Sequence, residues 1–456
     1  MQVSGTPAEP LDVPVTPRRT LLAALALIIG VLAGPASAGI DAGPWKGISS
    51  VVSGAVVAPR AIVLPVADRE SGPATPAQRD ALRRRLEAAL GGSTAGTVSA
   101  AVDVQGYGEV LRRGADSPLP PASTQKNYVG LSALVRLGPT ARYRTEVAAR
   151  APQVAGRVQG HVWLVAGGDP YLTMGYLRLL ARSVRAAGVT HIDGDVRLDD
   201  LRYDQRRTAP GWKASFMPGQ SGPLSALAVD RNRWRSDSTF LADPAFPAAV
   251  RFRDYLRAEG VSVAGTVRRD PRPADARALA VHNGTPLPAA VRRALKESDN
   301  FAAELLLKEL GRVVRGDGSS AGGLAAVRDV LGALAVPVGA GSDGSGLSAH
   351  DRQTTGGQVR LLRAADGSGS GAAFRASLPL GCRDGTLKRR YCGTRAEARV
   401  SAKTGTLPGV RALSGYTTTA SGRDVWFSFQ LSGVTEGAKA LAAIDRAVVA
   451  LASSTD

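Results

Sequence analysis

The chain has 456 residues, of which 44% are hydrophobic and 21% are charged, so it is long enough for two domains or for one domain that carries an insertion. Its formal net charge is +18, from 57 basic and 39 acidic residues, and a surface this basic attracts polyanions. Aromatic residues make up only 5% of the chain and no block of five basic residues occurs, which argues against a nucleic-acid partner.

The N-terminus has the layout of a secretory signal peptide over residues 1–38. Two arginines precede an apolar run over residues 21–32, and the small-residue sequence Ala-Ser-Ala follows at 36–38. The run is shorter than the roughly 20 residues of a membrane span, although an uncleaved anchor remains the alternative. We therefore expect an extracytoplasmic protein of the periplasm or cell wall, whose charge favours anionic cell-wall polymers and allows association with a membrane surface.

Residues 39–74 are rich in Gly, Ala, Val, Pro and Ser, a composition typical of a linker or loosely attached arm. A helix is predicted over 75–92, where leucines recur on one face. An alternating pattern around Gly-Tyr-Gly predicts a β-hairpin over 98–112.

The stretch at 118–137, PLPPASTQKNYVGLSALVRL, predicts a proline-led helix. Ser123 and Lys126 lie in its first turn, three residues apart on one face. There a serine is near free backbone N–H groups that stabilise an oxyanion, and a desolvated lysine can act as a base toward the hydroxyl. By itself the pattern is weak, since a merely polar first turn is the simpler interpretation.

Helices and strands then alternate over 140–276, which indicates an inserted domain with loose boundaries. Its strands are predicted at 143–149, 156–166, 191–198 and 261–267, and its helices at 171–187 and 250–259. After it we expect helices at 288–296, 300–310, 324–334 and 356–365, a Gly-rich loop at 311–323, strands at 400–403, 410–418 and 425–431, and a closing helix at 437–452. The predicted division is a signal peptide (1–38), a linker (39–74), a domain in two parts (75–139 and 277–456) and the insertion (140–276).

Three short patterns follow one another in the chain: Ser-Thr-Gln-Lys at 123–126, Ser-Asp-Asn at 298–300 and Lys-Thr-Gly at 403–405. Each is weak alone, but each falls where its chemistry needs it: at a helix start, in a turn between helices and on a strand. Together they are the S-x-x-K, S-x-N and K-T-G signature of penicillin-binding proteins and serine β-lactamases.

The surrounding sequence resembles the penicillin-binding protein 4 type of D-alanyl-D-alanine carboxypeptidase/endopeptidase, the low-molecular-mass class C enzymes of peptidase family S13. The resemblance covers roughly residues 75–452. It rests on VWLVAGGDPYLT (162–173), IDGDVRLDD (192–200), APGW (209–212), VDRNR (229–233), FAAELLLK (301–308), DGSGLS (343–348), LPLGCRDGTL (378–387) and VSAKTGTLPGVRALSGYTTTASG (400–422).

The resemblance implies an α/β (α+β) protein. Its β-lactamase/transpeptidase-like domain would have an antiparallel sheet flanked by helices and an all-helical part, and one inserted α/β domain would split it. In the implied reaction Ser123 attacks the carbonyl between two D-alanines and Lys126 takes its proton. Ser298 relays a proton toward the departing amine, while Asn300 holds the substrate peptide and Lys126.

For the far side of the implied site, Lys403 and Thr404 bind the terminal carboxylate, and Gly405 completes the K-T-G motif. The backbone N–H groups of Ser123 and Thr406 form the oxyanion hole. The implied ligands are peptidoglycan stem peptides and β-lactams, with neither a metal nor an organic cofactor.

Two cysteines, Cys382 and Cys392, lie close together before the K-T-G motif, and in an exported protein such a pair favours a disulfide over two free thiols. For the function, a D-Ala-D-Ala carboxypeptidase with or without DD-endopeptidase activity is the main hypothesis. A β-lactamase or esterase on the same fold and a catalytically silent cell-wall-binding protein remain the alternatives.

Overall fold

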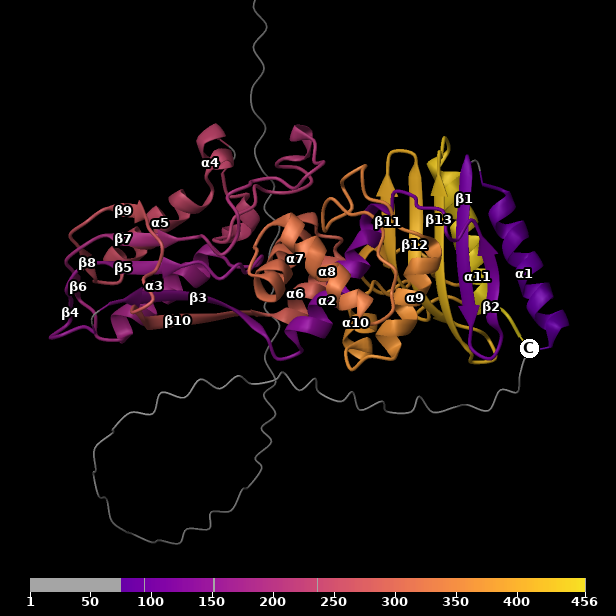
Figure 1. The fold of residues 1–456 in the computed structure, drawn as a ribbon, viewed down its shortest axis with the longest axis horizontal. Coiled ribbons are helices and arrows are strands. Elements are labelled where there is room, and N and C mark those ends of the chain that lie inside the picture. Colours follow the sequence, from indigo (N-terminus) through magenta and orange to yellow (C-terminus); the bar gives the residue numbers. More distant parts are fainter. Residues whose placement is uncertain (1–74, 94, 151, 236, 456) are drawn as a thin grey trace, which may run out of the picture. The chain divides into compact units, whose positions relative to one another are not determined.

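The computed structural model describes residues 75–93, 95–150, 152–235 and 237–455 (Figure 1). The predicted signal peptide at 1–38 and linker at 39–74 lie outside these residues. The described chain forms two five-stranded sheets, one three-stranded sheet and a set of helices, which confirms the predicted α/β class. Within this part of the chain, no helix combines the length and the apolar character that crossing a membrane requires.

The first sheet joins the two ends of the described chain. Its strands are β1 (Thr97–Val104), β2 (Gly108–Arg113), β11 (Ser401–Leu407), β12 (Val410–Thr418) and β13 (Asp424–Ser432). They run antiparallel in the order β11-β12-β13-β1-β2, and the register sets Thr97 opposite Ser432. The predicted hairpins are therefore confirmed, and the K-T-G strand forms one edge of the sheet.

Helices cover both faces of this sheet. They are α1 (Pro76–Gly91), α9 (Thr355–Asp366) and α11 (Gly437–Ala452). Helices α1 and α11 pack together on one face, over a core that includes Leu86, Val102 and Ile444 (Figure 1). Ala101 points to the opposite face, where Val359 of α9 packs against it.

A helical cluster surrounds the helix that follows the predicted nucleophile. Its members are α2 (Gln125–Leu137), α6 (Leu287–Lys296), α7 (Asn300–Arg315), α8 (Ser320–Gly332) and α10 (Gly371–Ser377). Helix α2 contacts all four of the others (Figure 1). Its side chains from Gln125 to Leu134 are buried. A helix enclosed on so many sides holds the residues of its first turn rigidly.

The Gly-rich loop predicted at 311–323 is shorter than expected and covers only residues 316–319, because α7 continues to Arg315 and α8 begins at Ser320. Gly316, with φ of 73°, ends α7, whereas Gly311 and Gly323 lie within helices and allow them to pack closely. A Cβ atom on Gly323 would lie 2.3 Å from the carbonyl oxygen of Leu307, and one on Gly311 would lie 2.4 Å from the backbone nitrogen of Gly323.

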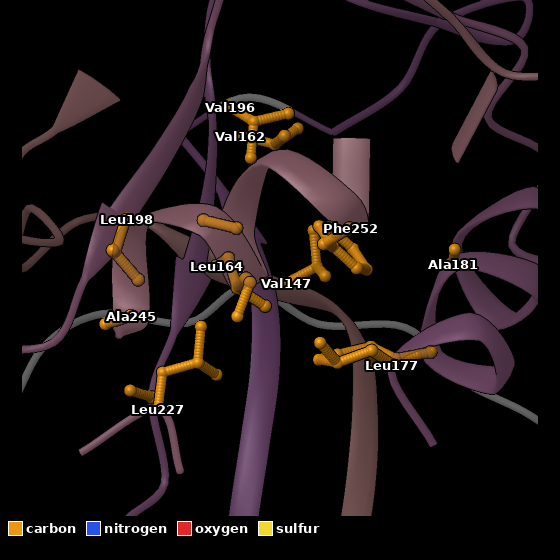
Figure 2. Close-up of a cluster of buried hydrophobic side chains, with 14 of the residues drawn as sticks. Val147, Val162, Leu164, Leu177, Ala181, Val196, Leu198, Leu227, Ala245 and Phe252 are labelled. Carbon is orange, nitrogen blue, oxygen red and sulfur yellow. The ribbon is translucent and has the colours of Figure 1, made fainter. Parts of the chain in front are cut away.

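The second sheet takes four of its five strands from the segment predicted as the insertion. Its strands are β3 (Arg142–Ala149), β5 (Val162–Val165), β7 (Val196–Asp199), β9 (Val267–Arg269) and β10 (Arg277–Pro286). The order is β10-β3-β5-β7-β9, with β5, β7 and β9 parallel. Helices α3 (Met174–Ala186) and α5 (Ala245–Ala258) pack together, and their side chains Leu177 and Phe252 meet Val147 and Leu164 of the sheet (Figure 2).

The strands predicted at 191–198 and 261–267 are each broken in two. Their first parts, β6 (His191–Ile192) and β8 (Ser262–Val263), join β4 (Arg157–Val158) in the small three-stranded sheet. The chain bends at Gly194, where a Cβ atom would lie 2.7 Å from the carbonyl oxygen of Gly160. The backbone nitrogen of Gly265 donates to the carbonyl of Gly194, so the second chain bends beside the first.

Strand β10 follows residue 276, the predicted end of the insertion, and pairs along its length with β3. We therefore propose that the inserted domain extends through Pro286. Helix α6 begins directly after it, at Leu287.

Candidate active site

The three sequence patterns meet in the structure. The Lys126 amine lies 3.0 Å from Ser123 Oγ and 2.8 Å from Asn300 Oδ1, and the Lys403 amine lies 2.9 Å from Ser298 Oγ. One site therefore contains the residues of all three patterns, drawn from the start of α2, the turn between α6 and α7, and strand β11.

Ser123 lies in a short 3₁₀ helix, Ala122–Thr124, which leads into α2, and not in the first turn of α2 as predicted. Ala122 has a left-handed backbone, with φ of 49°, which turns the chain just before the serine. Two glycines allow neighbouring backbone to approach this turn. A Cβ atom on Gly346 would lie 1.9 Å from the Ala122 carbonyl oxygen, and one on Gly405 would lie 2.8 Å from the Pro121 carbonyl oxygen. The glycine of K-T-G therefore lets β11 pack against the turn formed by residues 121–123, called the serine turn below.

The Ser-Asp-Asn turn separates α6 from α7. Asp299 caps α7 by accepting a hydrogen bond from the backbone of Ala302, and it also pairs with Arg231 at 2.6 Å. Ser298 has φ of 55°, so the chain reverses sharply at the residue whose hydroxyl meets Lys403. Asn300 is the first residue of α7, where its side chain faces the start of α2.

Lys126 is 1% exposed and lies close to three oxygen atoms. Besides Ser123 Oγ and Asn300 Oδ1, the backbone carbonyl of Ser345 accepts from its amine at 2.5 Å. Burial lowers the pKa of Lys126 to about 8, against the carboxylates of Asp343 and Asp299, which favour the charged form. A substantial fraction of the amine is therefore neutral in mildly alkaline solution.

The neutral form of this amine has a defined orientation. A neutral amine has two N–H bonds and one lone pair, and the Asn300 and Ser345 oxygens can only accept. When they take the two N–H bonds, the lone pair of Lys126 faces the hydroxyl of Ser123, which can be a donor. The geometry thus suits proton transfer from the serine to the lysine.

Lys403 is also buried, and its amine donates to Ser298 Oγ and to the Thr404 carbonyl, each at 2.9 Å. Burial, and after it the charge of Lys126, hold the pKa of Lys403 well below its ordinary value. Both acceptors are uncharged. An incoming carboxylate would favour the protonated amine, so the site is suited to binding an anion.

The two threonines predicted on β11 are more exposed than Lys403. Thr404 is half-buried and its hydroxyl contacts that of Thr386 at 2.9 Å. Thr406 is exposed and borders a cavity of about 690 Å³, which Lys213 and Arg411 also line. The cavity therefore opens where the strand leaves the serine turn.

The predicted disulfide between Cys382 and Cys392 is confirmed. It closes a loop just before β11, and Thr386 of that loop is the residue that contacts Thr404. The covalent link therefore braces the loop that contacts Thr404.

Sequence reasoning used the DGSGLS segment (343–348) only as part of the resemblance and gave Ser345 no role. The signal was a glycine-rich turn in a segment similar to the family, but residue spacing does not reveal which carbonyl faces Lys126. Gln220 was missed as well. Its backbone carbonyl accepts a hydrogen bond from Asn300 Nδ2 at 3.2 Å. A loop of the predicted insertion therefore holds the asparagine of the Ser-Asp-Asn pattern.

The chain matches the D-Ala-D-Ala carboxypeptidase 3 (S13) family over residues 80–239 and 235–455. It is 31% identical to a D-alanyl-D-alanine carboxypeptidase of Actinomadura sp., with 75% of this chain and 81% of the relative covered. It is 30% identical to a carboxypeptidase of Mycobacterium tuberculosis, with 81% and 83% covered. The fold is similar to that of penicillin-binding protein 4 from Haemophilus influenzae, with a TM-score of 0.70, 20% identity, and 80% of this chain and 97% of that chain covered. The chain therefore belongs to the D-Ala-D-Ala carboxypeptidase 3 (S13) family.

Proposed function

We propose that this serine-type D-Ala-D-Ala carboxypeptidase works through an acyl-enzyme formed on Ser123. The observation that carries the proposal is the buried amine of Lys126, 3.0 Å from Ser123 Oγ and 2.8 Å from Asn300 Oδ1. The neutral amine takes the hydroxyl proton while Oγ attacks the carbonyl carbon between the two D-alanines. The carbon–nitrogen bond then breaks, and the departing amine takes a proton relayed through Ser298. Asn300 holds the peptide group of the substrate and orients Lys126.

The rest of the site stabilises charge. The backbone N–H groups of Ser123 and Thr406 bind the developing oxyanion, and each such donor lowers the barrier by about 3 kcal/mol. Lys403 and Thr404 bind the terminal carboxylate of the substrate. Gly405 contributes by its lack of a side chain, which keeps β11 close to the serine turn.

Water then hydrolyses the ester and releases the shortened peptide. A β-lactam reacts in the same way, but its amine stays tethered to the acyl group when the ring opens. In a peptidoglycan cross-link the leaving amine belongs to a second peptide, so the same chemistry would give DD-endopeptidase activity.

The substrate class places the protein outside the cytoplasm. We further propose anionic cell-wall polymers as partners because the formal net charge is +18. The same charge favours association with an acidic membrane surface, whether the N-terminal segment is removed on export or is retained as an anchor.

Intact-mass spectrometry after brief exposure to a fluorescent penicillin tests the mechanism. We expect a single persistent adduct, and peptide mapping should place it on the peptide that contains Ser123. Rapid turnover of the drug without an adduct would instead support a β-lactamase. If neither an adduct nor turnover is observed, the result would support a silent wall-binding protein.

Acylation by penicillin should depend on pH through the base. Because burial lowers the pKa of Lys126 to about 8, the fraction of neutral amine rises as the pH rises through that value. The second-order acylation constant should therefore increase between about pH 6 and pH 9 and then level off. Stopped-flow fluorescence of the labelled penicillin measures this profile. A constant that falls over the same range would contradict a lysine base.

A further inference from the structure

The turn Asp343–Ser348 is built around one buried carboxylate that the proposed mechanism does not use. Oδ1 of Asp343 accepts from the backbone nitrogens of Ser345 and Gly346, at 2.9 and 2.6 Å. Oδ2 accepts from the backbone nitrogen of Ser348 at 2.9 Å and from the indole N–H of Trp212 at 2.6 Å. Both oxygens of a fully buried side chain are therefore committed to holding this turn.

The turn carries the carbonyl group that faces the base. Lys126 donates to the carbonyl of Ser345 at 2.5 Å, and the backbone nitrogen of the same Ser345 is held by Asp343. Glu304 of α7 holds the turn from the other side by accepting from the backbone nitrogen of Gly344 at 2.7 Å. The orientation of the Ser345 carbonyl is thus fixed by the side chain of Asp343, within the turn, and by that of Glu304, from α7.

Trp212 comes from the segment predicted as the insertion, 131 residues before Asp343. The residue before it, Gly211, has φ of 79°, and a Cβ atom there would lie 2.1 Å from Ser348 Oγ. Only a glycine allows this loop to approach so closely while the indole reaches the carboxylate.

We propose that Asp343 and Trp212 are positioning residues for Lys126. They hold the Ser345 carbonyl where it takes one N–H of the neutral amine, so that the lone pair of Lys126 stays directed at Ser123. This inference rests on the proposed acyl-enzyme mechanism. A loop of the insertion thus helps to position Lys126, through the hydrogen bond from the Trp212 indole to Asp343.

The test is the acylation rate of the full chain with fluorescent penicillin, measured for Asp343→Asn and Trp212→Phe. In Asp343→Asn the amide N–H₂ replaces one of the two oxygens and faces a pair of N–H donors in either orientation, so the turn must shift. A shift of about 1 Å at a catalytic group lowers the rate about 100-fold. In Trp212→Phe only the indole donor is lost, and removing one hydrogen bond to a charged group should lower the rate about tenfold. Trp234→Phe is the matched control, because its indole N–H has no partner among the described residues.

Each initial labelling rate is divided by the concentration of sites that can be labelled at all, which gives a rate constant per labelled site and separates positioning from partial unfolding. The pH profile gives a second readout. The groups around Lys126 are the carboxyls of Asp343, Asp299, Glu304 and Asp351 and the amine of Lys403. Asp343→Asn removes one negative charge that favours the protonated amine, so its rise in rate should move to lower pH, whereas Trp212→Phe should keep the wild-type midpoint.

Wild-type rate constants per labelled site in both variants would overturn the proposal, even if their melting temperatures fall. The proposed function has a separate criterion, since it fails only when the wild-type protein itself forms no adduct on Ser123.

Discussion

The Ser123→Ala variant is expected to form no adduct with penicillin and to release no D-alanine from a D-Ala-D-Ala peptide. The loss should be on the order of 10⁶-fold in the rate, as for other serine hydrolases that lose their nucleophile, because no other group takes over covalent attack. The variant should remain folded, since the substitution removes only the hydroxyl of Ser123, which lies in the 3₁₀ helix before α2. Intact-mass spectrometry and a coupled assay for D-alanine measure both losses.

Ser132→Ala is the matched control on the same helix. Ser132 is fully buried in α2 and its hydroxyl has no hydrogen-bond partner among the described residues. It should label at the wild-type rate. A persistent adduct in Ser123→Ala would show that another residue is acylated and would refute the assignment.

The Lys126→Arg variant should acylate about 10³-fold more slowly than the wild type, the range in which a general base contributes. A guanidinium group stays protonated at every pH that the protein tolerates and offers no lone pair to Ser123. The deficit should therefore widen as the pH rises, since only the wild-type amine gains activity as it passes its pKa of about 8. Stopped-flow labelling at several pH values measures it.

Lys126→Met, which keeps the length of the side chain without its charge, separates lost basicity from a steric effect of the larger arginine. Lys439→Arg, at an exposed position on α11, is the control for the substitution itself and should label normally. Rates of Lys126→Arg within a factor of about ten of wild type at pH 9 would exclude Lys126 as the base.

Local sequence was sufficient for much of the fold because short-range periodicity determines hairpins and amphipathic helices. The predicted hairpin of β12 and β13 and helices α1 and α11 are confirmed within a few residues. The breaks at Gly194 and Gly265 could not be predicted from periodicity, because they depend on the packing of one sheet against another segment. Gly311 and Gly323 were misinterpreted for the same reason, since a glycine at a helix crossing and one in a loop look alike in the sequence.

The candidate site divides in a similar way. Ser123, Lys126, Ser298, Asn300 and Lys403 carry reactive groups in known patterns, and the structure brings them together. Their assigned roles remain predictions. The supporting contacts were not visible, because the indole of Trp212 and the carboxylate of Asp343 are separated by 131 residues and neither belongs to a spaced motif. A backbone carbonyl such as that of Ser345 has no side-chain signature at all.

Strand β1 lies between β13 and β2, so the sheet that carries the K-T-G strand contains both the first strand of the described chain and its last three. During synthesis or export from the N-terminus, Ser123 emerges about 280 residues before β11. Until β13 reaches β1 and the long intervening chain is closed, the K-T-G strand has no fixed place beside Ser123. The enzyme therefore becomes active only after nearly its whole length has been synthesised or exported. A chain that stops before residue 424 contains Ser123 but lacks β13, so its K-T-G strand cannot be placed beside the serine.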